Sequence, residues 1–191
     1  MGVTTTSTAA GVVLAAGAGT RFGMPKILAA EGLWLKIAVS ALSGGGCGDV
    51  VVVLGAAIVD VPAPARAVVA QDWSRGLSAS LRAGITALGD DADLAVIHTV
   101  DTPDIGADVV RRVLTAARST PSGLARAWFG DRPGHPVVVG RQHWPALLRS
   151  LHGDEGAKRF LRGRSDVVRV DCSDLAGGRD IDTPNSGADA R

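Results

Sequence analysis

The sequence predicts an α/β protein: one three-layer α/β/α domain whose helices cover both faces of a mostly parallel β-sheet. The fully apolar run at residues 50–54 and the largely apolar run at 94–100 are typical of strands that are buried on both faces of such a sheet. Stretches with helical spacing of apolar residues separate these runs, and this alternation is the order of parallel βαβ units. At 191 residues the chain is long enough for one such domain with a full core and too short for two.

Composition limits the partners and the environment. Hydrophobic residues make up 46% of the chain and the net charge is +1, which is typical of a globular protein and argues against nucleic acid as a ligand. Cys47 and Cys172 are too few and too far apart for a disulfide framework or a Cys-x-x-Cys metal site, so we expect reduced thiols in a cytoplasmic protein. No apolar run reaches the length of a membrane span, and the polar start lacks the features of a signal peptide. We therefore expect no membrane association, a domain over residues 9–184, and flexible tails at 1–8 and 185–191.

The first predicted strand, at residues 12–16, runs into a loop of small residues. Glycines in this loop permit backbone angles with φ > 0 and let N–H groups approach an anion without a Cβ in the way. Two cationic side chains belong to the same stretch. The residues concerned are Gly17, Gly19, Arg21, Gly23 and Lys26. A strand, a glycine loop and two cations together predict a cradle for a polyphosphate.

Two better-known phosphate loops do not fit this stretch. A P-loop needs Gly-x-x-x-x-Gly-Lys followed by Ser or Thr, whereas the spacing from Gly17 to Gly23 is one residue too long and Met24 follows the second glycine. The dinucleotide fingerprint needs Gly-x-Gly-x-x-Gly, and the last glycine here comes one residue too late. The structural alternative is an ordinary strand-to-helix turn, and Arg21 and Lys26 favour a functional loop over it.

The next elements follow the βαβ order. They are a helix at residues 34–43 that ends at three glycines, strands at 50–54 and 67–70, and a helix over 77–88. Ser78 is expected to cap the start of this second helix. A helix start that follows Gly76 and small hydroxyl residues can admit a flat ring, whose edge is then read by backbone and hydroxyl groups.

Asp101 is the first residue beyond the buried strand at 94–100, at the edge where open α/β sheets bind ligands. A carboxylate there, beside a triphosphate loop, predicts a Mg²⁺ site, because hard cations take oxygen ligands. Asp180 and Asp182 stand two residues apart, so on an extended segment both side chains point to the same face and would complete the site. Asp180 is the preferred second ligand and Asp182 the preferred cap of the following turn, a choice that the sequence leaves open.

The remaining elements are a helix around 109–114, strands at 124–129, 137–139 and 167–170, and helices that begin at Trp144 and Asp154. The acidic start and basic end of the last helix suit the helix dipole. His135 is held between Gly134 and Pro136 and is suited to hydrogen-bond a phosphate group, the alternative being a structural turn residue. The other histidines, His98, His143 and His152, show no zinc spacing and are expected to be structural.

The stretch Leu14-Ala-Ala-Gly-x-Gly-x-Arg21-x-Gly23-x-Pro25-Lys26 resembles the signature of the nucleotidyltransferase (MobA-like NTP transferase) superfamily, which activates sugars, isoprenoid precursors and the molybdenum cofactor. The chain is most similar to the molybdenum cofactor cytidylyltransferases. Four stretches match motifs of that family: the run from Trp73 to Gly84, Gly-His-Pro at 134–136, Gly-Asp-Glu-Gly-Ala at 153–157 and Asp-Ile-Asp-Thr-Pro at 180–184. In the family, the Gly-Asp-Glu-Gly-Ala stretch lies on the acceptor side. The chain departs from the family at Phe22, where Met is commoner, at Val100, where Gly precedes the aspartate, and at Leu33, where the family has Lys in Gly-Lys-Pro-Leu-Leu.

The resemblance implies a Rossmann-like sheet of the nucleotide-diphospho-sugar transferase type and a role for each matched residue. Arg21, Lys26 and Asp101 are the implied catalytic residues. The implied nucleotide contacts are Ala15, Ala16, Gly17, Gly19, Arg21, Lys26, Gly76, Ser78 and Ser80; Gly134 and His135 would contact the acceptor, and Asp101 and Asp180 would hold Mg²⁺.

The implied activity is Mg²⁺-dependent transfer of CMP from CTP to the phosphate of a molybdopterin-type molybdenum cofactor, with release of pyrophosphate. CTP is preferred over GTP by analogy, from Ala15-Ala16-Gly17 and Pro25-Lys26. A molybdoenzyme of the xanthine dehydrogenase type is the implied protein partner. Two alternatives stay open: a nucleotidyltransferase for a sugar phosphate or another small phosphate, and an accessory protein that binds nucleotide and delivers cofactor to a molybdoenzyme without efficient catalysis.

Overall fold

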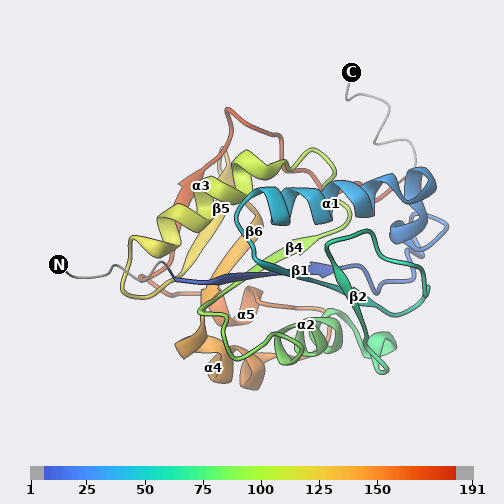
Figure 1. Ribbon diagram of the computed structural model, residues 1–191, viewed down its shortest axis with the longest axis horizontal. Coiled ribbons are helices and arrows are strands. Elements are labelled where there is room, and N and C mark those ends of the chain that lie inside the picture. The colour runs from blue at the N-terminus through green and yellow to red at the C-terminus, as the bar shows by residue number, and fades with distance from the viewer. Residues whose placement is uncertain (1–6, 184–191) are drawn as a thin grey trace.

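The computed structural model describes residues 7–183, and seven strands within them form one mixed sheet (Figure 1). The strands are β1 (Ala9–Leu14), β2 (Asp49–Leu54), β3 (Arg66–Val69), β4 (Leu94–Thr99), β5 (Ala125–Phe129), β6 (Arg132–Gly140) and β7 (Val168–Asp171). Their order is β3-β2-β1-β4-β6-β5-β7. Only β6 runs against its neighbours β4 and β5, and the other pairs are parallel. The predicted α/β class with a mostly parallel sheet is confirmed.

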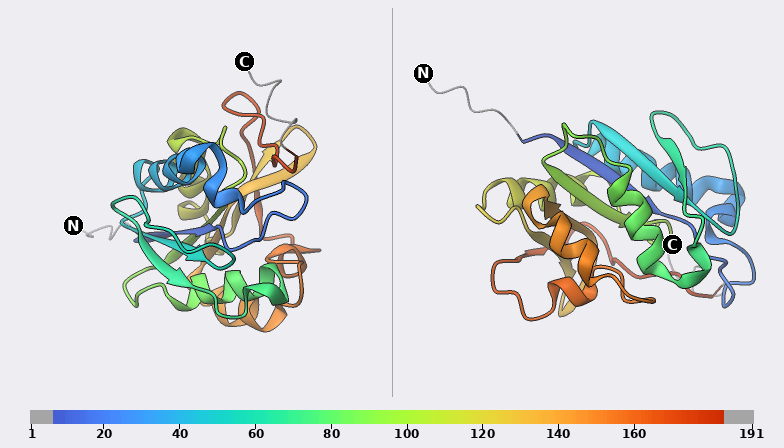
Figure 2. Two further views of the ribbon diagram at one scale, coloured as in Figure 1. Left: turned by 90° about the vertical axis from the view of Figure 1, so that its right-hand side faces the viewer. Right: turned by 90° about the horizontal axis from the view of Figure 1, so that it is seen from below.

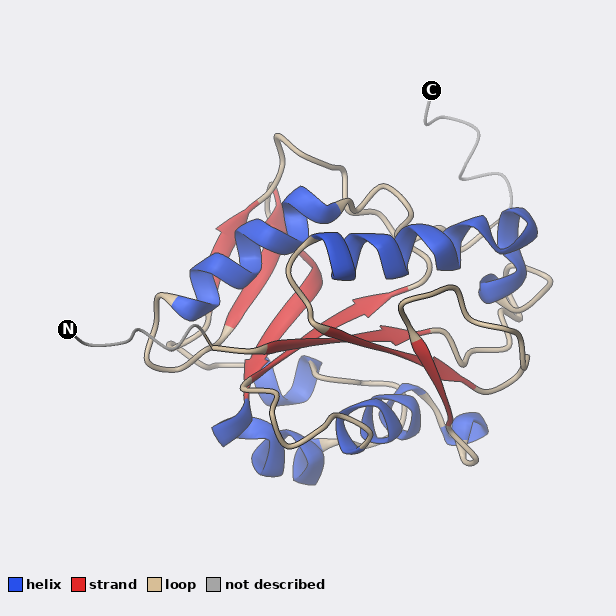
Figure 3. Cartoon of the chain, viewed as in Figure 1, coloured by secondary structure: helices blue, strands red, loops and turns tan. Residues whose placement is uncertain are grey.

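Helices cover both faces of the sheet, so the domain has three layers (Figure 3). The helices are α1 (Leu33–Gly44), α2 (Leu77–Thr86), α3 (Ala107–Arg118), α4 (Trp144–Ser150) and α5 (Lys158–Leu161), with short 3₁₀ helices η1 (Lys26–Gly32), η2 (Trp73–Arg75) and η3 (Arg141–His143). Helices α1 and α3 lie on one face and α2, α4 and α5 on the other (Figure 1). This two-sided cover explains why the central strands are apolar along their whole length.

Alternate residues along the central strands pack into the two core layers, one on each face of the sheet. Val13 belongs to a buried cluster with residues of α1 and α3, whereas its neighbour Val12 belongs to a second cluster with residues of α2 and α4. Glycines allow the closest approaches of helix to strand. A Cβ on Gly84 of α2 would lie 2.5 Å from Cγ1 of Val12, and a Cβ on Gly11 of β1 would lie 2.8 Å from Cδ1 of Leu42. Both helices therefore pack directly on β1.

The carboxyl ends of β1, β2 and β4 meet at one edge of the sheet, because these three strands are parallel neighbours. That edge faces the viewer in the left view of Figure 2, where the loop after β1 lies across it. Open α/β sheets bind ligands at this edge. The predicted phosphate loop and Asp101 are thus brought together by the topology.

Two predicted elements differ from the structure. The helix expected from Asp154 is limited to α5, which begins only at Lys158, because Gly153 and Gly156 both adopt φ of +52° and interrupt the helical path. Strand β6 begins at Arg132, so Gly134 and His135 lie on a strand that pairs with β5 and β4 rather than in a connecting loop.

One helical stretch in the described part of the chain, Lys26–Gly44, is apolar and long enough to cross a membrane by length and composition, which the sequence analysis did not anticipate. It is not one continuous α-helix, because Ala30 and Glu31 have φ of +49° and +56° and break it between η1 and α1. Helix α1 alone has 12 residues, and its buried face belongs to the core over the sheet. Packing in the domain thus accounts for its apolar character.

The two predicted tails lie mostly outside the described residues. Within them, Thr8 already belongs to the folded domain, since its backbone N–H donates to Asp93 Oδ2 at 2.9 Å. The cysteines Cys47 and Cys172 are both buried and unpaired, as expected for reduced thiols.

Candidate active site

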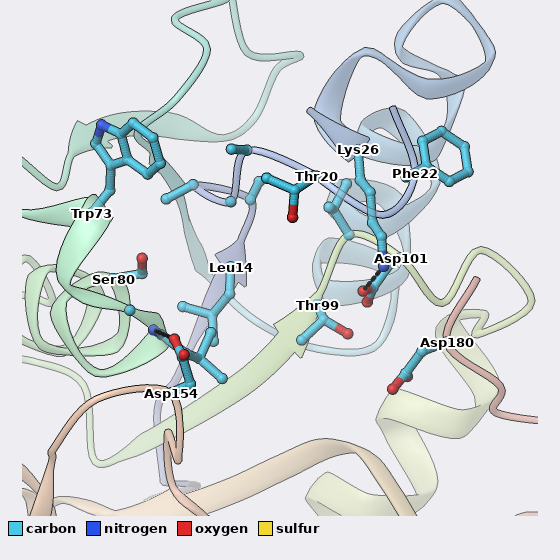
Figure 4. A pocket seen from close by; sticks show the side chains of 18 of the residues that line it. Leu14, Thr20, Phe22, Lys26, Trp73, Ser80, Thr99, Asp101, Asp154 and Asp180 are labelled. Atoms are coloured by element: carbon cyan, nitrogen blue, oxygen red, sulfur yellow. Dashed lines mark hydrogen bonds and ion pairs between the residues drawn. The ribbon is translucent and has the colours of Figure 1, made fainter. Parts of the chain in front are cut away.

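A pocket of about 540 Å³ opens at the carboxyl edge of β1 and β4. Figure 4 shows two ends: Lys26, Asp101 and Asp180 lie on one side, and Trp73, Ser80 and Asp154 on the other, with Leu14 at the end of β1 between them. The predicted residues that line it are Ala15, Ala16, Gly17, Gly19, Arg21, Lys26, Gly76, Ser80, Asp101, His135 and Asp180. Most of the site predicted from the sequence is therefore gathered in one cavity.

The loop after β1 forms one wall of this pocket. Gly19 adopts φ of +62°, and a Cβ there would lie 1.9 Å from the carbonyl oxygen of Met24, so the close turn admits only glycine. The Gly23 N–H donates to the Gly19 carbonyl at 2.8 Å and closes the turn. Gly17 does not adopt a positive φ, and a Cβ on it would meet nothing within 4 Å, so the backbone conformation requires glycine at Gly19 but not at Gly17.

Lys26 lies at the carboxylate end of the pocket, held between two aspartates. Its Nζ is 2.8 Å from Oδ2 of Asp101 and 2.8 Å from Oδ1 of Asp182, and only 15% of its side chain is exposed. Burial lowers the pKa of Lys26, but hydrogen bonds to Asp101 and Asp182 outweigh it and the pKa is raised overall. Hydrogen bonding to Lys26 in turn lowers the pKa of Asp182. Lys26 is therefore a charged group tied to carboxylates, and Asp182 binds it instead of acting only as a turn cap.

Asp101 and Asp180 differ in their surroundings from Asp182. Oδ1 of Asp101 is buried and has no hydrogen-bond partner among the described residues. Partial loss of solvent, and then the negative charges of Asp101 and Asp182, raise the pKa of Asp180. The three carboxylates of Asp101, Asp180 and Asp182 thus outnumber the single ammonium group of Lys26. Arg21 adds little to the balance, because its guanidinium lies 3.6 Å from Asp182 and its side chain is 81% exposed. An orphaned carboxylate oxygen within a surplus of negative charge fits a hard divalent cation.

The number of protein ligands limits how such a cation would be held. Among residues 7–183, no three or more His, Cys, Asp and Glu side chains gather closely enough to hold a metal ion. Mg²⁺ is commonly bound through one or two carboxylates, with substrate phosphates and water completing its shell. Asp101 and Asp180 fit that mode of binding rather than a site made entirely of protein groups.

A residue that the sequence analysis missed holds the segment that carries Asp180. Oδ2 of Asp104 accepts the backbone N–H groups of Gly177 and Gly178 at 2.9 and 2.8 Å. The Ile181 N–H donates to the carbonyl of Asp101 at 3.0 Å. The last described segment is thereby fastened on both sides of Asp180, next to the end of β4.

The opposite end of the pocket corrects the prediction for Ser78. Helix α2 has Gly76 as its N-cap and no side-chain cap, and Ser78 lines a separate groove behind the helix, whereas Gly76 and Ser80 line the pocket. The Leu77 N–H is satisfied instead by Oδ1 of Asp154 at 3.2 Å. Asp154 lies 77 residues away along the chain, so no local sequence signal indicated this contact.

Both Gly134 and His135 were predicted to contact the acceptor, but of the two only His135 lines the pocket. His135 is part-buried against the pocket with Nδ1 3.4 Å from the Ile97 carbonyl, and burial followed by the charge of Arg126 lowers its pKa. Gly134 does not line the pocket: its carbonyl accepts from Nε of Arg126 at 3.1 Å. The contact that the structure shows for Gly134 lies within the sheet, in β6.

His98 is fully buried behind the pocket, and neither ring nitrogen has a hydrogen-bond partner among the described residues. Burial, with a smaller effect of His135, lowers the pKa of His98 to about 3. The ring is therefore neutral at physiological pH.

Comparison with known proteins shows the family to which the chain belongs. Residues 11–169 match the model of the MobA-like NTP transferase domain. The chain belongs to this family. The matched span includes the glycine loop, Asp101, His135 and Asp154, so the family membership covers both ends of the pocket.

Relatives extend over almost the whole chain. The chain is 37% identical over 199 residues to a protein of Paenarthrobacter nicotinovorans named nicotine blue oxidoreductase, covering 96% of each. Among solved structures it is similar to a homologue of Rv0371c from Mycobacterium sp. strain JC1, with 29% identity, a TM-score of 0.79 and 94% and 92% of the two chains covered. Rv0371c of Mycobacterium tuberculosis H37Rv is 26% identical, with a TM-score of 0.76 and coverage of 96% and 97%. Rv0371c has also been solved in complex with manganese, a structure that matches at a TM-score of 0.67 with 24% identity over 86% and 88% of the chains.

Proposed function

We propose that this protein is a cytoplasmic, Mg²⁺-dependent nucleotidyltransferase that transfers CMP from CTP to the phosphate of a molybdopterin-type cofactor and releases pyrophosphate. One observation carries the proposal: the glycine loop, Lys26 and a surplus of carboxylates converge at one end of a pocket at the carboxyl edge of the sheet. A triphosphate and a divalent cation are together complementary to that set of charges. The family supplies the NTP transferase chemistry.

The chemistry is an in-line displacement at the α-phosphorus of the nucleotide. An oxygen of the acceptor phosphate forms a bond to that phosphorus as the bond to the bridging oxygen of pyrophosphate breaks. The loop that Gly19 and Gly23 shape would hold the phosphates through its backbone N–H groups. Lys26 and the exposed Arg21 would neutralise the negative charge that develops on the leaving group.

Asp101 and Asp180 would hold Mg²⁺, which when bound neutralises phosphate charge as a Lewis acid. The buried, unpartnered Oδ1 of Asp101 supports this assignment. Divalent metal binding has a precedent in Rv0371c, which has been solved with manganese. Asp182 is engaged by Lys26, which supports Asp180 over Asp182 as the second ligand.

The acceptor side rests on His135, which lines the pocket. Its lowered pKa makes the neutral imidazole the prevailing form, able to donate or accept one hydrogen bond to a phosphate or pterin group. A molybdoenzyme of the xanthine dehydrogenase type would then receive the nucleotide form of the cofactor.

The direct test is pyrophosphate release with Mg²⁺ and molybdopterin-bound molybdenum, offering CTP, GTP, ATP and UTP separately. We expect release with CTP and none from the Asp101→Ala variant. Release with GTP instead would overturn the base assignment and keep the chemistry. Release only when a sugar phosphate replaces the pterin acceptor would move the acceptor class, and nucleotide binding without any release would favour a cofactor delivery protein.

A second candidate function, that of an oxidoreductase, is favoured by the relative named nicotine blue oxidoreductase, which shares 96% coverage with this chain. Cys47 and Cys172 are both buried and unpaired, which favours a bound cofactor over a disulfide as the source of electrons. Because the glycine loop lacks the Gly-x-Gly-x-x-Gly spacing, a dinucleotide cofactor would have to bind in another way than through that fingerprint. Loss of nicotine blue absorbance in the presence of a reduced nicotinamide dinucleotide, without pyrophosphate release from any nucleotide, would establish this function in place of the first.

A further inference from the structure

We infer that Asp154 selects the nucleobase, by accepting one hydrogen bond from an exocyclic amino group such as that of cytosine. The inference rests on the proposed function, because it needs a nucleoside triphosphate whose phosphates lie at the Lys26 end of the pocket. The sequence predicts only Gly76, Ser78 and Ser80 near the base, and the resemblance assigns the stretch at 153–157, which contains Asp154, to the acceptor side. The structure adds a carboxylate to the same end of the cavity and moves Ser78 away from it.

Asp154 is fixed in place by the start of α2. Its Oδ1 accepts the Leu77 N–H at 3.2 Å, and the Ser78 N–H donates to the carbonyl of Gly153 at 2.9 Å. Gly76 has φ of +107°, and a Cβ there would lie 2.4 Å from Oδ1 of Asp154, so glycine at this position gives the carboxylate its room. The turn at residues 153–154 is thus docked on the helix start by two hydrogen bonds.

The position of Asp154 matches the place of a base rather than of a phosphate. Figure 4 shows it on the side of Trp73 and Ser80, across the pocket from Lys26 and Asp101. The ring of Trp73 offers a flat apolar surface on which a base can stack. Asp154 has no ion pair among the described residues, whereas its neighbour Glu155 pairs with Arg162 at 3.4 Å. The charge of Asp154 is therefore not used by a salt bridge of the fold.

The chemistry of one remaining carboxylate oxygen decides which base edge fits. An ionised carboxylate only accepts hydrogen bonds, and Oδ1 is already occupied by the Leu77 N–H. Oδ2 has no hydrogen bond among the described residues and can accept the N–H of an exocyclic amino group, such as that of cytosine. Uracil presents a carbonyl at the same position and would be repelled.

The test is the Asp154→Asn variant, because its amide oxygen can still accept the Leu77 N–H while its NH₂ group replaces Oδ2. An NH₂ group donates and should therefore prefer the carbonyl of uracil. We expect wild-type protein to bind CTP about tenfold or more tightly than UTP, and Asp154→Asn to reverse that order. The measurement is isothermal titration calorimetry with Mg²⁺ and each nucleotide, with no acceptor present. Glu155→Gln is the matched control, and its preference for CTP should equal that of wild type.

The outcomes separate this inference from the function on which it rests. A reversed preference in Asp154→Asn with normal binding in Glu155→Gln supports base selection by Asp154. A CTP to UTP ratio that stays at the wild-type value in Asp154→Asn overturns the inference alone. Failure of the wild-type protein to bind any of the four nucleoside triphosphates overturns the proposed function together with the inference.

Discussion

Replacing Lys26 with methionine tests whether the carboxylate end of the pocket is held together by this one lysine. The change removes the ammonium group that lies 2.8 Å from both Asp101 and Asp182, and keeps most of the apolar length of the side chain. A hydrogen bond to a charged group contributes about 1.5–3 kcal/mol to stability. The carboxyl of Asp182 is half exposed, so its bond to Lys26 counts for little, whereas Asp101 is 22% exposed and would be left unpaired. We expect a loss of about 2 kcal/mol at neutral pH, mainly through Asp101.

The pH dependence of that loss follows from the direction of the shifts. The pKa of Asp182 is lowered by Lys26, so the pair stabilises the fold above the unfolded aspartate pKa of about 3.9 and the effect disappears as the pH falls through the lower folded value. The pKa of Lys26 is raised in the folded protein. The stabilisation by the Lys26 ammonium is therefore complete below the unfolded lysine pKa of about 10.4, and it is lost as the pH rises through the higher pKa of folded Lys26. The part of the difference between wild type and Lys26→Met that comes from Asp182 should therefore be constant near neutrality and decrease below about pH 4.

Urea unfolding provides the assay. With a slope of about 2 kcal/mol per molar urea, the expected loss lowers the unfolding midpoint by about 1 M at pH 7.5. The control is Lys36→Met, because Lys36 is exposed on α1 and has no ion pair in the described part of the chain. The reasoning is refuted if Lys26→Met and Lys36→Met have the same midpoint at pH 7.5.

Three further predictions concern the loop, the metal ligand and the buried histidine. Gly19→Ala should weaken CTP binding at least tenfold in calorimetry and lower the melting temperature, because the added Cβ would lie 1.9 Å from a backbone oxygen. Gly17→Ala is the control and should melt like wild type, because a Cβ at that position has open space around it. Asp101→Ala should abolish pyrophosphate release and leave the circular dichroism spectrum unchanged; retained turnover would remove Asp101 from the metal site. His98→Leu should lose less stability in acid than wild type, by about 2 kcal/mol between pH 6.5 and 5 in urea unfolding. The reason is that the folded pKa of His98 is about 3, so in this range only the unfolded wild-type chain takes up a proton on His98. Equal acid sensitivity would show that His98 is protonated in the folded state.

Local pattern was enough to predict most of the fold. Apolar runs and glycine stops located β1, β2, β4, α1 and α3 to within a few residues, because strands that are buried on both faces leave a continuous apolar signal. The signal fails where the chain depends on distant partners. Residues 154–157 have the composition of a helix start, but Asp154 is committed to the Leu77 N–H.

The same distinction applies to the site. Arg21, Lys26 and Asp101 were predicted as a phosphate and metal set because the sheet edge collects them. That Lys26 lies between Asp101 and Asp182 depends on sequence separations of 75 and 156 residues. Asp104, whose carboxylate fastens the Gly177–Gly178 turn, has no sequence motif of its own. Such contacts arise only when the whole chain has folded.

The central claim is tested most directly by following the nucleotide itself. CTP labelled at the α-phosphate would be incubated with Mg²⁺, molybdopterin-bound molybdenum and the protein, and the label would be located by chromatography and mass spectrometry. The account predicts label in a product that carries CMP on the acceptor phosphate, with an equal amount of pyrophosphate and no transfer by Asp101→Ala. Label that remains entirely in CTP, while the same preparation consumes nicotine blue with a reduced nicotinamide dinucleotide, would contradict it.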